Sequence, residues 1–278
     1  MTNTPHSQEV IIEANRIQKE YLKDIYRYRE LLYFFAWRDL LVRYKQAFFG
    51  VTWALLRPLL NMAVFAFLFG RIAKFPSGDI SYPLFVLAAM LPWQLFANSI
   101  IDTCNSLVNN ATLVSKVYFP RMLIPLSQII VQYLEFAITM GLLLLLGAFF
   151  GGIDLLTLLA FPFALILLTL LCMGIGFWLS ALTVQYRDFR IVVPFVVQFG
   201  MFLSPVGYGT FLVPEEWRLL YFLNPMVGII DSFRWVFFGI SYPMMEYSVI
   251  FSTVITGLLL VSGYRYFRKM ERTFADQI

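Results

Sequence analysis

Long runs of apolar residues constrain the fold of this chain more than any other feature. A helix needs about 20 mostly apolar residues to cross roughly 30 Å of hydrocarbon. Six windows of the sequence meet or approach that length, at residues 51–71, 83–103, 122–150, 155–183, 190–207 and 246–267. The third and fourth windows exceed one crossing, so they are expected to tilt or to extend past the membrane. Because no segment shows the alternation of a transmembrane barrel, the sequence predicts an all-α, polytopic membrane protein with a six-helix domain over 51–267.

The amount of apolar surface excludes a water-soluble fold of this size. Hydrophobic residues make up 60% of the 278 positions and charged residues 14%, whereas soluble domains average about half apolar and a quarter charged. Cys104 and Cys172 belong to no metal or disulfide pattern, and the only histidine is His6. Residues 1–30 are polar and lack the apolar core of a cleavable signal peptide. We therefore expect no metal or cofactor in this chain, and no nucleic-acid partner.

The distribution of lysine and arginine predicts the orientation of the six windows. With both termini inside, the inside segments carry 16 of these residues and the outside segments carry four, namely Arg71, Lys74, Arg218 and Arg234. Such an excess marks the cytoplasmic side. The N-terminal segment 1–30 and the tail 268–278 are therefore predicted to be cytoplasmic, in the inner membrane of a bacterium.

Residues 31–46 are apolar but too charged to cross the membrane. Leu32, Phe35 and Leu40 recur at helical spacing, and Arg38 and Arg43 interrupt them. This pattern predicts an amphipathic helix in the cytoplasmic interface. A plain membrane-surface anchor is the alternative.

The outside segment 208–245 also fails to span, and the short helices expected in it lie at about 208–240. Pro214 and Pro225 interrupt apolar pieces that are each too short for a crossing. Short re-entrant or interfacial helices would satisfy the backbone groups of such pieces. The alternative is a folded extracytoplasmic cap with no gating role.

Three ionisable residues, Arg57, Asp102 and Glu135, lie inside the predicted spans. Ionisable residues are costly there and are functional candidates by default. Arg57 lies about 9 Å below the inside boundary, at 1.5 Å per residue. It either pairs with Glu135, as a structural ion pair, or meets an anionic head-group.

Several motifs of soluble catalysis are missing. The chain has no GxxxxGK[ST], HExxH or GxSxG sequence, so we expect no nucleotide binding and no enzymatic activity of its own. Gly174 and Gly176 form an isolated GxG inside a span, where close helix packing is the expected reason.

The inside loop between the second and third spans is expected to form a brief helix, at about 105–118. This helix is either a handle for a soluble partner or a simple connection.

Aromatic residues make up 18% of the chain. Tryptophan and tyrosine are common at membrane interfaces, so many of them are expected to form an ordinary belt. A carbohydrate conduit would also use aromatic faces with polar tips. The sequence does not decide which aromatics serve which purpose.

Five groups of residues resemble the permease subunits of the ABC-2 exporter family, in the branch that exports O-antigen, capsule and teichoic acid. Their order and spacing carry the resemblance, which covers roughly residues 31–240. The groups are Trp37-Arg38-Asp39 with Arg43-Tyr44, Gly50–Trp53 and Arg57-Pro58-Leu59; Leu91-Pro92-Trp93 with Phe96 and Ser99; Lys116–Pro120 with Pro125; Tyr186-Arg187-Asp188 with Arg190; and Leu203-Ser204-Pro205 with Asn224-Pro225 and Phe233-Arg234.

The resemblance implies a homodimer with a twelve-helix pore and two copies of a separate ATPase, which hold ATP and Mg²⁺. The substrate would be an undecaprenyl-diphosphate-linked polysaccharide, most simply O-antigen, with the first and fifth spans beside a lateral opening to the membrane lipids. The implied head-group residues are Arg38, Arg43, Lys45 and Arg57. The implied ATPase-coupling residues are Asn109, Leu113, Lys116, Val117, Tyr186, Arg187 and Asp188. The implied gate residues are Pro205, Trp217, Tyr221, Asn224, Pro225, Phe233 and Arg234.

Other functions remain open at this point. Within the family, the nearest alternatives export capsular polysaccharide, teichoic acid, drugs or small lipids. A secondary transporter would need internal repeats and paired intramembrane acids, and no convincing repeat is visible. A membrane glycosyltransferase or ligase would need an acidic or histidine active site facing a loop, which the single histidine disfavours for several such enzymes.

Overall fold

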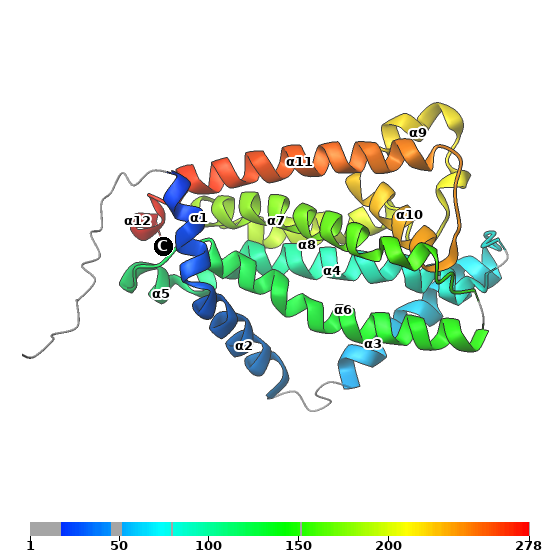
Figure 1. The fold of residues 1–278 in the computed structure, drawn as a ribbon, viewed down its shortest axis with the longest axis horizontal. Coiled ribbons are helices and arrows are strands. Elements are labelled where there is room, and N and C mark those ends of the chain that lie inside the picture. The colour runs from blue at the N-terminus through cyan, green and yellow to red at the C-terminus, as the bar shows by residue number, and fades with distance from the viewer. Residues whose placement is uncertain (1–17, 46–51, 79, 151, 278) are drawn as a thin grey trace, which may run out of the picture.

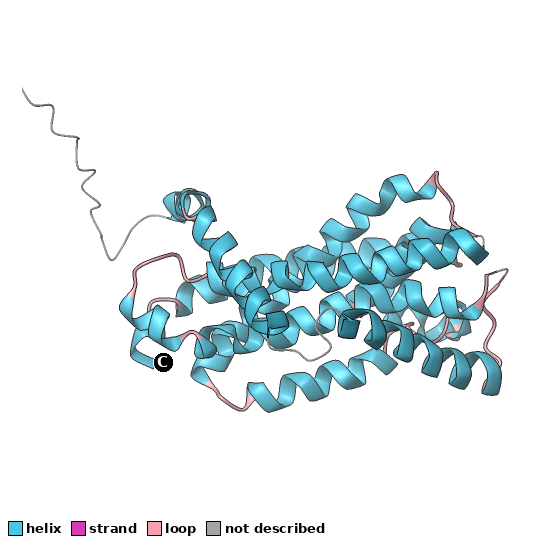
Figure 2. Ribbon diagram, turned by 90° about the horizontal axis from the view of Figure 1, so that it is seen from below, coloured by secondary structure: helices cyan, strands magenta, loops and turns pink. Residues whose placement is uncertain are grey.

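The computed structural model describes residues 18–45, 52–78, 80–150 and 152–277. In these ranges every regular element is a helix, which confirms the predicted all-α class (Figures 1 and 2). The long helices lie side by side along the longest axis of the molecule. Helices α1, α5 and α12 meet at one end of this bundle, called here the terminal end, and α9 lies at the other.

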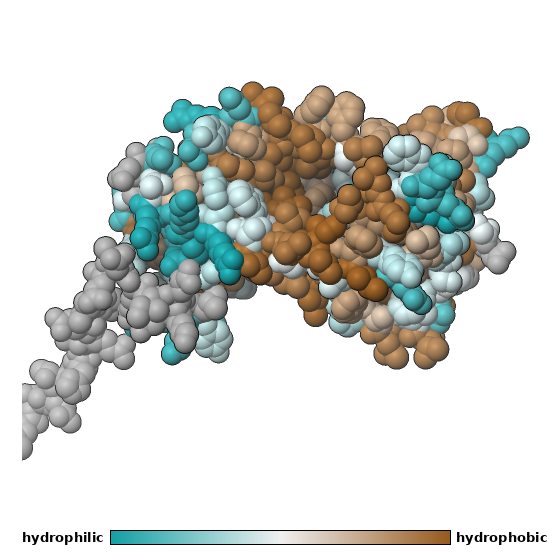
Figure 3. Space-filling model, turned by 90° about the horizontal axis from the view of Figure 1, so that it is seen from above, coloured by the Kyte–Doolittle hydropathy of each residue, from teal (hydrophilic) through white to brown (hydrophobic). Residues whose placement is uncertain are grey.

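Within the described ranges, five helical segments are long and apolar enough to cross a membrane. The first is α3 (Thr52–Phe65) with its π-helical continuation (Ala66–Ile72), and the others are α4 (Tyr82–Asn109), α6 (Leu123–Phe150), α7 (Phe161–Gln185) with a preceding 3-10 turn (Thr157–Ala160), and α11 (Met245–Met270). They occupy the windows expected from the sequence. Figure 3 shows their apolar surface as a band between two more hydrophilic ends. The chain is therefore a multi-pass membrane protein.

The predicted window 190–207 contains a shorter helix than expected. Helix α8 (Phe189–Phe202) has 14 residues, which cover only about 21 Å at 1.5 Å per residue. The chain leaves the helix just before Ser204-Pro205, because a proline disfavours the helical conformation of the residue before it. The residues that follow are turns rather than a sixth long helix.

Helix α4 is the centre of the bundle. It contacts α3, α6, α7, α8 and α10, and 78% of its most apolar window is buried, against 11% for the α3 segment. Its side chains from Leu84 to Leu91 are almost fully covered. Helix α3 therefore lies at the periphery and exposes most of its apolar surface.

Glycines allow α7 and α11 to approach each other closely. A Cβ atom on Gly263 would lie 2.2 Å from the carbonyl oxygen of Gly174, and one on Gly174 would lie 2.7 Å from the backbone nitrogen of Leu260. A Cβ on Gly176 would lie 3.0 Å from the Thr103 hydroxyl. Small residues at such crossings bring helix backbones into contact, as expected for the isolated GxG sequence.

The terminal end has a hydrophobic core of its own. Helices α1 (Gln18–Arg27), α2 (Arg29–Lys45), α5 (Ala111–Lys116) and α12 (Phe274–Gln277) converge there. The buried side chains of this terminal core include Phe35, Val114, Phe119, Phe267 and Phe274. Parts of the predicted N-terminal segment 1–30 and of the predicted tail 268–278 thus form helices of the packed structure.

Glu271 fastens the terminal end together. Its carboxylate accepts hydrogen bonds from the Tyr21 hydroxyl, at 2.8 Å, and from the backbone N–H of Arg121, at 3.0 Å. Burial raises the pKa of Tyr21 above its ordinary value, and the charge of Glu271 raises it further. The hydroxyl therefore remains a donor at physiological pH, and it joins α1 to the segment after α11.

The predicted helix at 105–118 is divided between two elements. Residues up to Asn109 continue α4, and only Ala111–Lys116 form the separate helix α5. The break is at Asn110, whose φ of −110° and ψ of 25° are not helical. Its side-chain amide donates to the Ser106 carbonyl at 2.9 Å, a local bond that competes with helix continuation.

The predicted re-entrant segment forms short helices. These are a 3-10 turn (Thr210–Leu212), α9 (Glu215–Tyr221) and α10 (Pro225–Phe238). Asn224 caps α10 by accepting a hydrogen bond from the Met226 N–H at 3.0 Å. Helix α10 packs against α4, α7 and α11 and is buried along most of its length.

Candidate functional site

A polar pocket of about 750 Å³ opens between α2, α4, α6 and the start of α8. Three arginines and two aspartates line it, together with asparagine, glutamine and serine side chains. The lining residues are Arg38, Asp39, Val42, Arg43, Asp102, Asn105, Ser106, Asn109, Asn110, Gln128 and Arg190. Among residues predicted to bind an anionic head-group, Arg38 and Arg43 lie here, whereas Lys45 and Arg57 are exposed elsewhere on α2 and α3.

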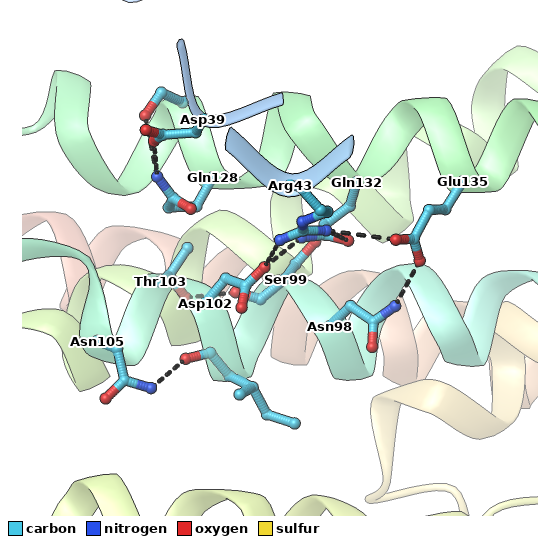
Figure 4. A network of polar contacts seen from close by, with 12 residues as sticks. Asp39, Arg43, Asn98, Ser99, Asp102, Thr103, Asn105, Gln128, Gln132 and Glu135 are labelled. Atoms are coloured by element: carbon cyan, nitrogen blue, oxygen red, sulfur yellow. Dashed lines mark hydrogen bonds and ion pairs between the residues drawn. The ribbon is translucent and has the colours of Figure 1, made fainter. Parts of the chain in front are cut away.

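Arg43 reaches from α2 to acids on two other helices (Figure 4). Its guanidinium pairs with Asp102 on α4 and with Glu135 on α6, the latter at 3.4 Å. It also donates to the Gln132 side-chain oxygen at 3.1 Å, and the Gln132 amide donates to Asp102. Asn98 donates to the second Glu135 oxygen at 3.1 Å. Each carboxylate therefore has a cation and an amide, which lowers the cost of placing it in an apolar bundle.

Of the two alternatives for Arg57, the ion pair with Glu135 is wrong, and contact with an anionic head-group stays a prediction. Glu135 contacts Arg43 instead, and the structure places Arg57 on an exposed face of α3. The sequence identifies Asp102 and Glu135 as functional candidates because they lie inside apolar windows. Their partner was missed because Arg43 lies outside those windows, on a helix whose packing against α6 is a tertiary feature.

Two arginines hold the junction between α4 and α5. Arg38 donates to the Asn110 side-chain oxygen at 2.8 Å and pairs with the adjacent Asp39 at 2.7 Å. Arg190, from the first turn of α8, donates to the Asn109 side-chain oxygen at 2.8 Å. The Arg190 Nε is buried and has no hydrogen-bond partner among the described residues.

Arg190 was not among the predicted head-group residues. Its sequence signal was the Tyr186-Arg187-Asp188 group just before it, which pointed to a partner surface and not to the pocket. In the described ranges, Arg190 is the lining arginine with no acidic partner. It is therefore the pocket's most available cation.

The predicted ATPase-coupling residues lie at the terminal end. Leu113 packs against the terminal core, whereas Val117 is 51% exposed. Lys116 ends α5 on the surface, and Tyr186, Arg187 and Asp188 form the exposed turn between α7 and α8. Asn109 differs from the others because it faces the polar pocket.

The predicted gate contains a fully buried arginine. Arg234 on α10 lies over the Phe85 ring, with its guanidinium carbon 3.7 Å from the ring centroid. It donates to the carbonyls of Val206, at 3.1 Å, and Tyr208, at 3.0 Å. These bonds fasten the turns after α8 to α10 and supply the partners that a buried cation needs.

An apolar groove of about 790 Å³ runs along α8 toward α9. The predicted gate residues Trp217, Tyr221, Asn224 and Pro225 line it. At its rim, the Tyr221 hydroxyl donates to that of Tyr208 at 3.0 Å. The remaining predicted gate residues, Pro205, Phe233 and Arg234, are buried beneath this surface. The gate set thus divides into residues that line the groove and residues that anchor it.

Comparison with known proteins finds one matching family and several similar transport proteins. Residues 30–238 match the profile of the family described as ABC-2 type transporter. The chain is 27% identical to the O-antigen export system permease protein RfbA of Myxococcus xanthus, over 92% of this chain and 98% of that protein. It is 29% identical to the protein of the same name from Klebsiella pneumoniae, over 89% and 94%. It is 22% identical to the polysialic acid transport protein KpsM of Escherichia coli, over 71% and 77%.

Proposed function

Since the chain belongs to the ABC-2 type transporter family, we propose that it is the membrane permease subunit of an exporter of lipid-linked polysaccharide. The observation that carries the proposal is the similarity, over nearly the whole of both chains, to two O-antigen export permeases. The substrate proposed is undecaprenyl-diphosphate-linked O-antigen. The membrane proposed is the bacterial inner membrane.

The polar pocket is the proposed site of the diphosphate head-group. Arg38, Arg43 and Arg190 bring three planar guanidinium groups to one cavity, and such groups bind phosphate oxygens with paired, charge-assisted hydrogen bonds. Lys45 and Arg57, which are exposed, are proposed to meet anionic lipid head-groups at the interface. The apolar groove along α8 suits an isoprenoid chain or the apolar faces of sugars.

The terminal end is the proposed docking surface of a separate ATPase. This end carries α5 and the exposed Tyr186–Asp188 turn, which follows Val184 of the terminal core. Two ATPase copies, which hold ATP and Mg²⁺, would bind beneath two copies of this chain. Both termini would be cytoplasmic, as the lysine and arginine distribution predicts.

Purification of the tagged chain in mild detergent tests this proposal. We expect a P-loop ATPase to copurify in equal amount with the chain. We also expect a strain that lacks the chain to accumulate lipid-linked glycan on the cytoplasmic side and to lose the surface polymer. Recovery of the chain without a nucleotide-binding partner would contradict the proposal.

The glycan that accumulates also identifies the substrate. Capsular polysaccharide is the second candidate, because the chain is similar to a polysialic acid transport protein over 71% of its length. Accumulation of capsule precursor with normal O-antigen would replace the first candidate by the second.

Val117→Asp tests the coupling role of α5. Val117 is 51% exposed, so a charge there is expected to weaken ATPase docking without disturbing the permease fold. Leu113→Asp is a less specific test, because Leu113 packs on the terminal core. Normal assembly and export by the Val117→Asp variant would exclude this position from the ATPase contact.

A further inference from the structure

The junction between α4 and α5 depends on hydrogen bonds from two other helices. Asn110 ends α4 and begins α5, and its side-chain oxygen is held by Arg38 of α2 at 2.8 Å. The neighbouring Asn109 is held in the same way by Arg190 of α8, also at 2.8 Å. We call these two contacts the junction clasp. The position of α5 is therefore tied to α2 and α8.

All four residues of the junction clasp also line the polar pocket. An anion in that pocket would compete with the two asparagines for the same guanidinium groups. A bond from arginine to an amide oxygen has one charged partner, whereas a bond to a phosphate oxygen has two, and a phosphate can accept two parallel N–H bonds from one guanidinium. A diphosphate is therefore a better partner for these arginines than a neutral amide oxygen.

The three pocket arginines differ in how firmly the protein holds them. Arg43 is fixed by Asp102 and Glu135. Arg38 has one adjacent acid, Asp39, which also accepts a bond from Gln128 at 2.6 Å. Arg190 has only the amide of Asn109, and its Nε is without a partner in the described part of the chain. An incoming anion would thus bind Arg190 first and Arg38 next.

We propose that the junction clasp senses the occupancy of the pocket. A diphosphate that binds Arg38 and Arg190 releases Asn110 and Asn109, and the freed junction changes how α5 is presented to the ATPase. Because the ligand binds the released state better than the clasped state, it shifts the equilibrium between them. This mechanism rests on the proposed function and adds a direct connection between head-group binding and the ATPase.

The test uses the permease–ATPase complex in vesicles of phosphatidylethanolamine and phosphatidylglycerol. The probe is farnesyl diphosphate, a short polyprenyl diphosphate, and the measurement is the rate of ATP hydrolysis. The double variant Asn109→Ala/Asn110→Ala removes the acceptors and keeps the arginines. It should hydrolyse ATP without the probe at the rate that the wild type reaches only with it, and it should respond little to added probe.

Asn109→Asp should act in the opposite direction. A carboxylate at this position would hold Arg190 more tightly, so the half-maximal response should need roughly fivefold more probe. A merely structural role would make both changes harmful in the same direction. Ser241→Asp adds the same charge on the exposed loop before α11, away from the terminal end, and its response should equal that of the wild type. Inorganic pyrophosphate, added in a separate series, shows whether the diphosphate alone is enough.

Two results would contradict the proposed sensing role of the junction clasp. One is a wild-type complex that responds to neither probe. The other is a pair of asparagine variants whose ATP hydrolysis, with and without the probe, equals that of the wild type. Either result leaves the proposed function intact if the ATPase copurifies and export in cells is normal. Loss of copurification with the wild-type chain would instead be a failure of the proposed function.

Discussion

Arg43 is shared between two carboxylates, so the loss of the cation and the loss of one acid have different consequences. Asp102, Glu135 and Arg43 have side chains that are between 25% and 31% exposed. Their mutual attraction is thus screened less than at the surface and more than in a dry core.

Arg43→Met should destabilise the protein by about 1–3 kcal/mol, because it leaves two carboxylates close together without a cation. Asp102→Asn and Glu135→Gln should each cost less than about 1 kcal/mol, since the amides keep their hydrogen bonds. Adding both amide substitutions to Arg43→Met should recover most of the loss. Thermal unfolding in a single detergent measures these differences. A triple variant no more stable than Arg43→Met would show that charge is not the cause.

Arg234→Lys should destabilise the protein by about 3 kcal/mol. A lysine cannot make the forked contacts with the Val206 and Tyr208 carbonyls, nor stack as well on Phe85. Arg71→Lys, at an exposed position, is the matched control and should change stability by less than about 0.5 kcal/mol. The same unfolding measurement applies. Equal stability of the Arg234→Lys variant and the wild type would exclude an anchoring role for the guanidinium.

The acidic site residues were predictable from the sequence, and most of their contacts were not. Asp102 and Glu135 are recognisable because a charge inside an apolar window is costly. Arg190 gives no such signal, because it lies among other charged residues at the start of a helix. Its place in the pocket depends on how α8 packs against α4, and one sequence does not contain that information.

At the scale of elements, the apolar windows predicted the long helices, because about 20 apolar residues have few other solutions in a bilayer. The structure differs from the predicted windows where a local feature of the backbone ends or extends a helix. Helix α8 stops before Pro205, and α4 continues to Asn109 before the chain turns. Hydropathy does not report such local backbone events. It also does not report burial, so the central position of α4 could not be distinguished from the peripheral position of α3.

Gly263→Ala should separate α7 from α11 and cost about 1–3 kcal/mol, as overpacking does. The added Cβ would lie 2.2 Å from the Gly174 carbonyl oxygen, an atom of rigid helix backbone. Gly257→Ala is the control on the same helix, because a Cβ there meets nothing within 4 Å. It should be neutral or stabilising by up to about 1 kcal/mol. Thermal unfolding distinguishes the two, and equal effects would contradict the packing explanation.

At the scale of the whole molecule, the exposed apolar faces of α3 and α8 are the proposed contact between two copies. Residues of α8 such as Ile191 and Phe195 are 80% and 60% exposed, and Leu60 on α3 is 55% exposed. Helix α8 is too short to cross alone, so its polar backbone ends need cover from protein. A second copy would provide that cover.

Leu60→Cys combined with Phe195→Cys should give a covalent dimer on mild oxidation. The background carries Cys104→Ser and Cys172→Ser, which removes the two buried native thiols. Leu60→Cys with Ile166→Cys is the control, since Ile166 is similarly exposed, at 58%, but lies on α7. Non-reducing electrophoresis shows the product. Equal cross-linking of both pairs, or of neither, would exclude contact between α3 and α8.

The terminal core also bears on how the protein is made. Tyr21 and Glu271 are 250 positions apart in the chain, and Phe274 packs in the same core as Val114 of α5. A ribosome delivers the earlier helices to the membrane before these last residues emerge. Helix α5, which is proposed to contact the ATPase, therefore completes its packing only when synthesis has passed Phe274. Truncated chains, although inserted in the membrane, would lack a complete docking surface and would not bind the ATPase.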